Sequence, residues 1–409
     1  MMMNRLALAA AVSASLIAKA QGRIKKPKGA CQVEGNDGTG TIGPPQRVLS
    51  FSRRLNYNWD DDHVKQDYLG SGAFLPDKNV ITGIKIGPGV KSNPENTNVF
   101  LTVPRWFGGV PSTLNRVTVD LTQPDTAFPI QDPKLEAWPS WEMQEVGNCD
   151  ALQYVQSMEI DNDGLMWAID TGRVDIFTAS PNNKCPPKLV ILDVTSGEMV
   201  GEPYIFPEDV APYDSVFLND ITIDNVNKVA YISDMTGAND DGTAGALIMY
   251  DQNSGTSMRF AHSSMQPELG LEWIFENESL GVDAFAVSIN GVALTPDLSR
   301  LYYSALQQSG STYSVDTNAL RQALNDGDST IDWGLALIDH GPRRSFTDGM
   351  TFDCAGNLFH SSINEGSFYK WDSSSEESPL ESGVLAWENT DNTCGMWWTD
   401  TYAWDDEVR

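Results

Sequence analysis

Apolar and polar positions alternate along the chain in short runs, and turn-forming residues separate one run from the next. The clearest example is EIDNDGLMWAIDTG, residues 159–172, in which two apolar strands flank Asp161, Asn162, Asp163 and Gly164. Asp, Asn and Gly supply the backbone angles of tight turns, whereas β-branched and aromatic residues favour strands. The pattern therefore predicts a β-hairpin over these residues.

Five other stretches repeat this pattern, at 98–106 (NVFLTVPRW), 222–237, 293–306, 351–364 and 389–401. A repeated unit that is too small to bury its own apolar face must stack against its neighbours. Closing such units into a ring removes the unpaired edges of the sheets. The sequence predicts an all-β fold, a six-bladed β-propeller that forms one domain over residues 46–409.

The first residues predict export. Arg5 precedes an apolar run over residues 6–18, and Ala18, Lys19 and Ala20 form a small-x-small cleavage site. We expect a signal peptide at residues 1–20, a flexible basic and then Gly/Pro-rich leader at 21–45, and a secreted, extracellular protein. A membrane anchor at the same segment is the alternative, although the apolar run is short for a span.

Charge and cysteine content fit this expectation. The formal net charge of −29 disfavours nucleic acid and acidic membranes as partners. Five cysteines in an exported chain permit two disulfides. We expect Cys149 to pair with Cys185 and Cys354 with Cys394, which leaves Cys31, and Asn277 stands in a glycosylation sequon.

Counting back five residues from each turn residue identifies the start of the first strand of each hairpin, which lies nearest the channel of a propeller. The count gives polar residues in most copies and Ala386 in the sixth: Thr82 by a looser alignment, then Gln156, Asn219, Asn290 and Asp348. Converging amide and carboxylate oxygens suit a hard cation such as calcium, or a polar small ligand in a concave site. The alternative is that these strand starts are polar because they face water.

Further candidates surround this predicted axis. Trp106 and Phe107 end the first hairpin and could rim the channel, and Thr347 and Asn364 are polar candidates of the fifth hairpin. His360 follows Asp348 in that hairpin and is the best placed histidine for acid–base work. An aromatic wall beside Asn, Asp and Thr would suit a catechol, indole or quinoid ligand.

Other chemistries are excluded by missing motifs. The sequence has no CxxC pair and no helical pair of histidines for zinc. It also lacks a GxSxG elbow and a Gly-rich phosphate loop, so we expect neither a serine hydrolase nor a nucleotide-dependent enzyme.

Three phrases, FLNDITID, INGVALTPD and TDGMTFDCAGNLF, resemble the axis-lining phrases of gluconolactonase, regucalcin and paraoxonase type propellers. The resemblance implies that Asn219, Asn290 and Asp348 bind a catalytic calcium and that Asp348 serves as a general base. That family also uses a glutamate from the first blade, and Thr82 stands in its place here.

A longer resemblance, over roughly residues 46–372, is to the Yellow and major royal jelly protein family. It is carried in order by VFLTVPRWFGGVPSTLNRV, LMWAIDTG, CPPKLVILDV, VAYISD and LYYSALQQSGSTYSVDTNALR, whereas MWWTDTYAW departs from the family. The resemblance implies a secreted six-bladed propeller whose channel binds small aromatic amines in some members, and Yellow members include enzymes that convert dopachrome.

Three hypotheses follow. The first is a Yellow-type propeller that binds a small aromatic or quinoid molecule and acts as an isomerase or tautomerase, with Asp348 as base and His360 or Asn290 as polarising partner. The second is a calcium-dependent lactonase or esterase at the same axis. The third is a structural or nutritive secreted protein without catalysis.

Overall fold

A computed structural model describes residues 50–51, 54–90, 93–120, 130–131, 133–236, 245–275, 278–388, 398 and 400–403. Several predictions lie outside these residues: the signal peptide, the leader, Cys31, Asn277, Cys394 and most of the hairpin at 389–401. Within the described part, no helix has both the length and the apolar character that crossing a membrane requires.

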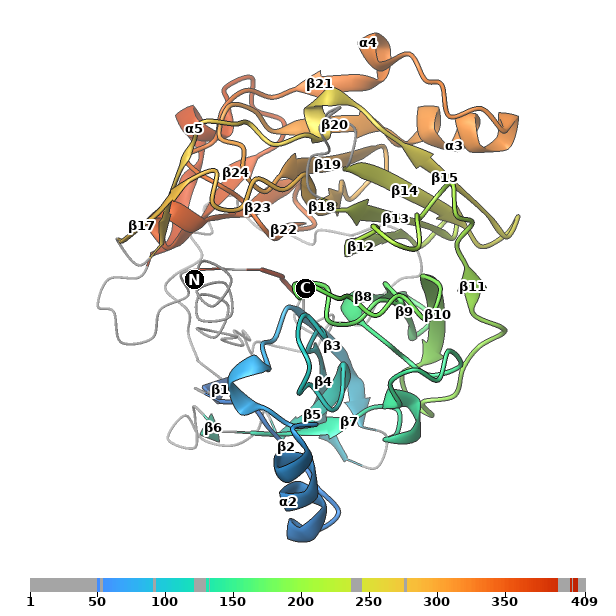
Figure 1. Ribbon diagram of the computed structural model, residues 1–409. Helices are drawn as coiled ribbons and strands as arrows, with labels where there is room; N and C mark the ends of the chain where they lie inside the picture. Colours follow the sequence, from blue (N-terminus) through green and yellow to red (C-terminus); the bar gives the residue numbers. More distant parts are fainter. Residues whose placement is uncertain are drawn as a thin grey trace.

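Five sheets of four or five strands, antiparallel except for one strand of the first sheet, stand around a common axis (Figure 1). We number them as blades 1 to 5 in chain order and give the strands from the axis outward. Blade 1 consists of β3 (Gly83–Val90), β4 (Asn93–Thr102), β5 (Leu114–Asp120), β7 (Lys134–Ala137) and the parallel β2 (Asn56–Tyr57). Blade 2 consists of β8 (Val155–Ile160), β9 (Leu165–Asp170), β10 (Lys188–Asp193) and β11 (Tyr204–Ile205).

The next three sheets have the same plan. Blade 3 consists of β12 (Leu218–Asp224), β13 (Val229–Asp234), β14 (Ala246–Asp251) and β15 (Thr256–Phe260). Blade 4 consists of β18 (Ile289–Leu294), β19 (Arg300–Ala305), β20 (Tyr313–Asp316) and β21 (Leu337–Asp339). Blade 5 consists of β22 (Met350–Phe352), β23 (Asn357–Ser362), β24 (Ser367–Asp372) and β25 (Val384–Glu388).

The inner strands lie nearest the centre and contact one another in the order β3, β8, β12, β18 and β22 (Figure 1). Side chains of adjacent blades pack between the sheets: Trp167 of blade 2, for example, belongs to one buried cluster with Ile232 of blade 3. The fold is an all-β propeller. The described residues form five blades, where six are predicted from the sequence.

Four of the predicted hairpins are confirmed, namely β8–β9, β12–β13, β18–β19 and β22–β23. The first prediction is wrong, because residues 98–106 contain the end of the single strand β4 and the loop after it, and β4 pairs with β3. The stretch does form a strand, as its composition predicts, but the turn of the hairpin lies before it, between β3 and β4.

Turn chemistry explains why the confirmed hairpins form where they do. Asp161 Oδ1 accepts the main-chain N–H groups of Asp163 and Leu165, each at 2.9 Å, and Gly164 has a φ of +78°. A side chain that satisfies the backbone in this way stabilises a tight turn without help from the rest of the fold. Asp353 makes the same pair of bonds in blade 5.

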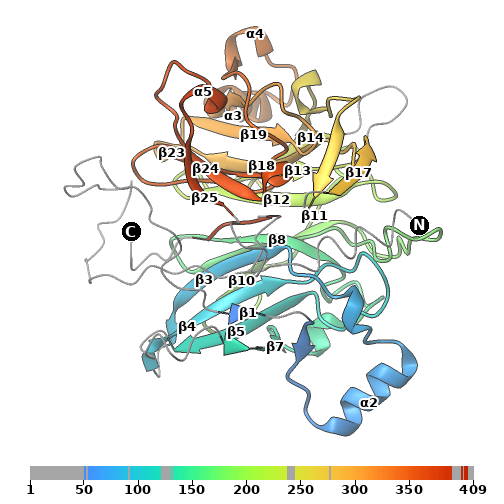
Figure 2. The ribbon, with the colours of Figure 1, turned by 90° about the vertical axis from the view of Figure 1, so that its left-hand side faces the viewer.

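Smaller elements decorate the ring. The hairpin of β16 (Glu272–Phe275) and β17 (Glu278–Val282) is inserted between blades 3 and 4, and β1 (Ser50–Phe51) pairs with β6 (Ile130–Gln131). Helix α2 (Asp62–Ser71) projects from the body beyond blade 1 (Figure 2). The remaining helices are α3 (Thr317–Asp326), α4 (Trp333–Ala336) and α5 (Pro379–Ser382), with 3-10 turns η1 (Pro76–Lys78), η3 (Glu142–Gln144), η4 (Ser263–Met265) and η5 (Ile363–Glu365).

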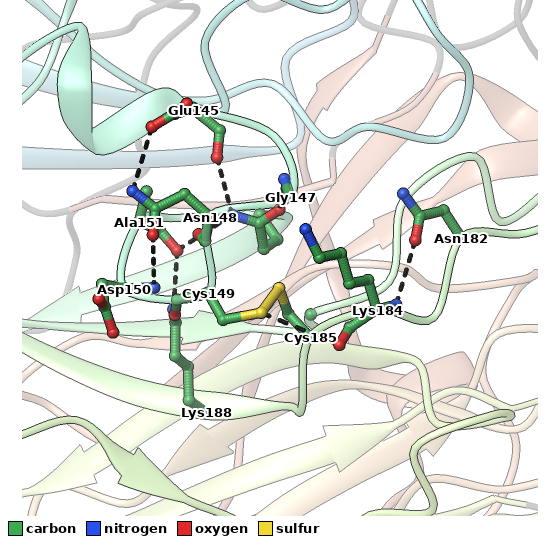
Figure 3. The surroundings of a disulfide bond; sticks show 12 residues. Glu145, Gly147, Asn148, Cys149, Asp150, Ala151, Asn182, Lys184, Cys185 and Lys188 are labelled. Atoms are coloured by element: carbon green, nitrogen blue, oxygen red, sulfur yellow. Dashed lines mark hydrogen bonds between the residues drawn. A yellow bond between two sulfur atoms is a disulfide. The ribbon is translucent and has the colours of Figure 1, made fainter.

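The predicted disulfide between Cys149 and Cys185 is confirmed (Figure 3). It joins the loop before β8 to the loop before β10, so it fixes the entrance of the inner strand of blade 2. Cys354 is also disulfide-bonded, and its predicted pairing with Cys394 stays a prediction because Cys394 lies outside the described residues.

Candidate functional site

Three inner strands carry a β-bulge at the same point, close to the axis. The pairing register shifts within β8, β12 and β18, and the bulges contain Gln156, Asn219 and Asn290. A bulge places an extra residue against its partner strand and re-aims the side chains. Three of the five polar residues found by counting back from the turns therefore lie in these bulges.

Asn219, Asn290 and Asp348 are brought together there. Asn219 Nδ2 donates to Asn290 Oδ1, and Asn290 Nδ2 lies 3.2 Å from Met235 Sδ. The Asn290 amide also interacts with the Asp348 carboxyl group. The three side chains are 4%, 2% and 5% exposed, so they are shielded from bulk water.

Thr82 and Gln156 lie at the same level but already have protein partners. The main-chain oxygen of Gln156 accepts from the Thr82 hydroxyl at 2.9 Å and from the Thr102 hydroxyl at 2.7 Å. Gln156 Oε1 accepts from Tyr154 Oη at 2.7 Å and from Trp106 Nε1 at 3.3 Å. These bonds join blades 1 and 2, so their observed role is structural.

Asp400 was missed from the sequence, and its carboxyl group interacts electrostatically with that of Asp348. The sixth copy of the axis position was predicted at Ala386. That residue instead lies in β25, the outermost strand of blade 5. The sequence does contain a signal for Asp400. An aromatic residue, Thr and Asp at 346–348 are followed five residues later by Asp353, and the same types at 398–400 are followed five residues later by Asp405.

Two close main-chain approaches support this alignment. A Cβ atom on Gly291 would lie 2.0 Å from the main-chain oxygen of Asp348, and one on Gly349 would lie 2.3 Å from that of Asp400. In both cases the glycine follows an axis residue and packs against the axis residue of the next copy. The main chain of Asp400 therefore packs beside blade 5 in the same way as the main chain of Asp348 packs beside blade 4.

A third carboxyl group near the axis was also missed. Asp220 lies in the bulge of β12 and accepts from Val292 N at 3.0 Å and from Ser157 Oγ at 3.2 Å. It thereby connects blades 2, 3 and 4. Burial raises the pKa of Asp220 to about 6, and these hydrogen bonds together with the Lys85 ammonium group counteract part of that rise.

Electrostatics distinguish the Asp348 and Asp400 pair from ordinary surface carboxyls. Burial raises the pKa of Asp348 to about 7, and the negative charge of Asp220 adds to the rise. Burial and the charge of Asp348 hold the pKa of Asp400 well above its usual range. Burial and mutual repulsion therefore both favour the protonated forms of these two carboxyl groups.

An apolar cluster covers the polar residues; we call it the axial apolar cluster. Five members lie two residues before an axis position, namely Val80, Tyr154, Phe217, Phe346 and Trp398. The other members are Trp106, Val174, Met235, Trp273, Phe275, Leu306 and Ile363. Trp398 stacks on Trp273 with ring centroids 5.6 Å apart, and its Nε1 donates to Asp348 Oδ2. Trp273 belongs to the inserted β16 and was not identified from the sequence.

Trp106 belongs to the axial apolar cluster, and Phe107 packs against it. Trp106 is buried and packs against Phe177 at 5.8 Å, whereas Phe107 is half-buried. The Lys78 ammonium group lies 4.3 Å from the centre of the Phe107 ring. Phe107 is thus the more accessible of the two.

The remaining candidates of the fifth hairpin do not meet Asp348. His360 contacts the main-chain oxygen of Ser361 at 3.2 Å and stacks with Tyr369, and among the described residues no hydrogen bond joins it to Asp348. Burial lowers the pKa of His360 to about 4, so the ring is neutral at pH 7. The Thr347 hydroxyl also binds Ser361 O, and Asn364 donates to Glu272 O of β16.

Two oxygens of the predicted calcium set already accept hydrogen bonds. Asn290 Oδ1 already accepts from Asn219, and Asp348 Oδ2 accepts from Trp398. In the described ranges, no three His, Cys, Asp or Glu side chains are placed to hold a metal ion. We assign no step to calcium on this geometry.

Comparison with known proteins adds a family. A family model described as major royal jelly protein matches residues 153–396. Protein yellow of Drosophila madeirensis is 27% identical over 359 residues, which are 84% of this chain and 58% of that protein. The chain thus spans a little more than half the length of this relative.

Solved structures with similar folds are more distant. Regucalcin from Agrobacterium tumefaciens str. C58, titled a calcium-binding protein, is 12% identical over 72% of each chain, with a TM-score of 0.37. The propeller of Dos1 is 10% identical, with a TM-score of 0.40, and the match covers 78% of this chain and 74% of that one.

Proposed function

Because the chain belongs to the major royal jelly protein family, we propose that it is a secreted propeller that binds a small aromatic or quinoid molecule at its axis and isomerises it by moving a proton. The observation that carries this proposal is the position of the Asp348 carboxyl group directly beneath the axial apolar cluster. A planar ring needs an apolar enclosure, and a proton shift needs a base at its edge.

In this proposal each group has a defined task. Asp348, with a pKa of about 7, is ionised in part at neutral pH and takes a proton from the ligand. The Asn219 and Asn290 amides orient a ligand oxygen or nitrogen by hydrogen bonds. Trp273 and Phe346, whose rings lie 4.6 Å apart, form a wall that excludes water from the reacting atoms.

The number of blades and the secretion of the protein are part of the same proposal. We infer that residues 398 and 400–403 belong to a sixth blade, since Lys85 of β3 donates to Tyr402 O at 3.0 Å on one side and Gly349 packs against Asp400 on the other. Secretion is supported by the apolar N-terminal sequence and by the Cys149–Cys185 disulfide. A direct check on secretion is N-terminal sequencing of protein from culture medium, where we expect a start near residue 21.

The decisive experiment measures binding and turnover together. Purified protein is titrated by calorimetry with a catecholamine and with an indole amine, and the loss of dopachrome is followed with and without protein. We expect saturable binding of at least one aromatic compound and faster dopachrome loss. Asp348→Asn should lose turnover by about 100-fold or more, which is the usual contribution of a general base.

Asp326→Asn, an exposed aspartate at the end of α3, is the matched control and should behave as the parent. If neither binding nor turnover occurs, and Asp348→Asn matches the parent, the proposal fails. A broad thermal-shift screen without any stabilising ligand would then favour the structural or nutritive alternative, because a ligand that binds the folded state raises its stability.

A further inference from the structure

The junction between blades 4 and 5 is apolar at one level and polar at the next. Tyr302 of β19 and Leu358 of β23 belong to one buried cluster across the junction, and the Trp371 ring of β24 lies 6.3 Å from that of Tyr302. Every second residue of a strand points to the same face. Ser304 of β19 and His360 of β23 therefore continue the facing surfaces of the two blades by one level.

Polar atoms at this second level are buried without partners. Six side-chain atoms of the two blades and their loops have no hydrogen-bond partner in the described part of the chain: Ser304 Oγ, Gln308 Oε1, Thr312 Oγ1, Arg343 Nε, His360 Nε2 and Ser367 Oγ. The six residues are at most 8% exposed. Buried polar groups are nearly always paired, so their concentration at one junction points to ordered water or to an ion.

The Arg343 guanidinium group lies in the mouth of the hairpin formed by β19 and β20. Its Nη2 donates to Ala305 O at 3.1 Å, and its Nη1 donates to Ser311 O. The register of β19 and β20, extended by two residues, places positions 305 and 311 opposite one another. The guanidinium group thus bridges the two strands directly beyond the pair of Ser304 and Thr312.

The unpaired Nε–H of Arg343 lies beside the same pair. Nε is two bonds from Nη2, which contacts Ala305 O, and Ala305 follows Ser304 in the chain. In a guanidinium group, the Nε–H and one Nη2–H form the edge that binds anions with parallel hydrogen bonds. The hydroxyl groups of Ser304 and Thr312 can also donate. Three potential donors without partners therefore meet at this point.

A comparison with Arg105 shows what Arg343 lacks. Both arginines are 3% exposed, but Nε, Nη1 and Nη2 of Arg105 donate to five main-chain oxygens, and Arg343 has only the two bonds in the hairpin mouth. Among the described residues, no carboxylate forms an ion pair with Arg343. Glu268 acts on it only from a greater distance, and its Oε2 accepts from Ser309 N and Gly310 N. A buried cation with so few partners is costly.

We propose that a monovalent anion of the chloride class binds between blades 4 and 5, on Arg343 Nε and on the Ser304 and Thr312 hydroxyl groups. The anion supplies the negative charge that the guanidinium group lacks and accepts from all three donors. A single-atom ion suits the site better than a carboxylate or a phosphate, because the surrounding groups are almost fully shielded. This inference is independent of the function proposed for the axis.

Two nearby atoms that only accept hydrogen bonds fit the hydration of such an ion. His360 Nδ1 lies 3.2 Å from Ser361 O, so the ring proton is on Nδ1 and Nε2 is an acceptor. Gln308 Oε1 is an acceptor as well. A water molecule that donates one hydrogen to the anion and the other to either acceptor satisfies both.

The site supports one wall of the axis. Arg343 holds residues 305 and 311, which are the two ends of the loop that follows β19. Leu306 of this loop belongs to the axial apolar cluster, and Gln307 Oε1 accepts from Trp273 Nε1 at 2.6 Å. We therefore expect the anion to stabilise this loop together with the junction of the two blades.

Thermal unfolding tests the proposal, with sodium chloride exchanged for sodium gluconate at constant ionic strength. The unfolding midpoint of the parent should rise by about 2 °C for each tenfold increase in chloride above its dissociation constant. Arg343→Met should lose this response. The control is Arg116→Met, which removes an arginine of β5 that is 2.8 Å from Glu136, and it should keep the response.

Ser304→Ala covers the case in which Arg343→Met does not fold. It should keep the fold and raise the chloride dissociation constant about tenfold, because one hydrogen bond to a charged group is lost. Crystals grown in sodium bromide should show an anomalous peak within hydrogen-bond distance of Arg343 Nε. A chloride response that Arg343→Met or Ser304→Ala leaves unchanged overturns the inference, and so does the absence of the bromide peak. A parent that does not respond to chloride would mean that water alone fills the junction.

Discussion

Asp170 and Asp348 are both buried aspartates beside an inner strand, but their carboxylate groups have different partners. Asp170 accepts the main-chain N–H groups of Gln153, Tyr154 and Gly172, each at 2.8 Å, and Lys188 Nζ lies 3.7 Å away. Asp348 Oδ2 accepts the Trp398 N–H, the Asn290 amide interacts with the same carboxyl group, and Asp348 Oδ1 has no hydrogen-bond partner in the described part of the chain.

This difference separates a structural acid from a functional candidate. Buried polar groups in folded proteins are nearly always satisfied, and a buried charge is stable only with hydrogen bonds and an opposite charge. Asp170 meets both conditions and fixes the loop that begins β8. Asp348 meets neither in full, which leaves free capacity that a ligand or a proton can use.

The largest expected effect comes from breaking the satisfied site. Lys188 is 1% exposed and donates to the main-chain oxygens of Cys149 and Ala151 (Figure 3). Its ammonium group also faces Asp170. Lys188→Met should lower the free energy of unfolding by about 3–5 kcal/mol, because it leaves a buried carboxylate without its cation. Urea denaturation measures this loss.

The exposed Lys134 of β7 provides the control, and Lys134→Met should change the free energy of unfolding by less than about 0.5 kcal/mol. A Lys188→Met protein as stable as the control variant would show that the three N–H groups alone satisfy Asp170.

A smaller effect is expected from forcing the Asp348 and Asp400 segments apart. A Cβ atom on Gly349 would meet the main chain of Asp400 at 2.3 Å, and main-chain atoms cannot move aside as a flexible side chain can. Gly349→Ala should cost about 1–3 kcal/mol of stability and abolish saturable aromatic binding. Calorimetric titration and urea denaturation measure the two effects.

Gly70→Ala in α2 is the matched control, because nothing lies within 4 Å of its Cβ position and alanine favours a helix. It should keep binding unchanged. Unchanged binding in Gly349→Ala would show that Asp400 is not held against blade 5.

The third prediction concerns pH and has the opposite sign. The pKa of Asp348 is raised to about 7, so the folded state holds a proton that the unfolded chain releases near pH 4. Stability therefore decreases as pH rises from about 4 to 7, and the cost is fully present above that range. Asp348→Asn should raise the free energy of unfolding by about 1–3 kcal/mol at pH 8 and leave it nearly unchanged at pH 3.5.

Urea denaturation of parent and variant at both pH values measures this difference. If the parent and Asp348→Asn have equal free energies of unfolding at pH 8, the ionised Asp348 carboxylate is stabilised by its partners in the folded state as fully as Asp170 is. A gain in stability together with a loss of turnover is the pattern expected when a strained site is kept for its function.

Much of the fold could be predicted from the sequence because its signals are local. Asp161 and Asp353 form their turns with residues two and four positions ahead, so the same short phrase marks the same turn in different blades. Once the turns are fixed, a constant count reaches Gln156, Asn219, Asn290 and Asp348. The count works because a strand advances by a fixed rise per residue.

The rest depended on contacts between distant segments. Ala386 was chosen by counting back from the wrong turn, although Asp405 marks the better one, and Asp400 meets Asp348 only in the folded ring. Trp273 reaches the axis from the hairpin of β16 and β17, which is inserted between blades 3 and 4. His360 stacks on Tyr369, its cross-strand neighbour in β24, and the alternation along a strand does not reveal which neighbour a side chain will contact.

The smallest expected effect is that of removing calcium. An axial calcium would need the oxygens of Asn290 and Asp348. Asn219 donates to Asn290 Oδ1 and Trp398 donates to Asp348 Oδ2, which leaves Asp348 Oδ1 open, whereas a calcium ion takes six to eight oxygen ligands. Dialysis against a calcium chelator should therefore shift the thermal unfolding midpoint by less than about 1 °C, and millimolar calcium should not restore any lost turnover. Differential scanning calorimetry of the dialysed protein, with magnesium as the control cation, measures the shift. A calcium-specific rise in the midpoint that Asp348→Asn abolishes would mean that the two amides and the indole turn away from the axis when the ion binds, and the calcium-dependent lactonase or esterase hypothesis would then replace the proton shift.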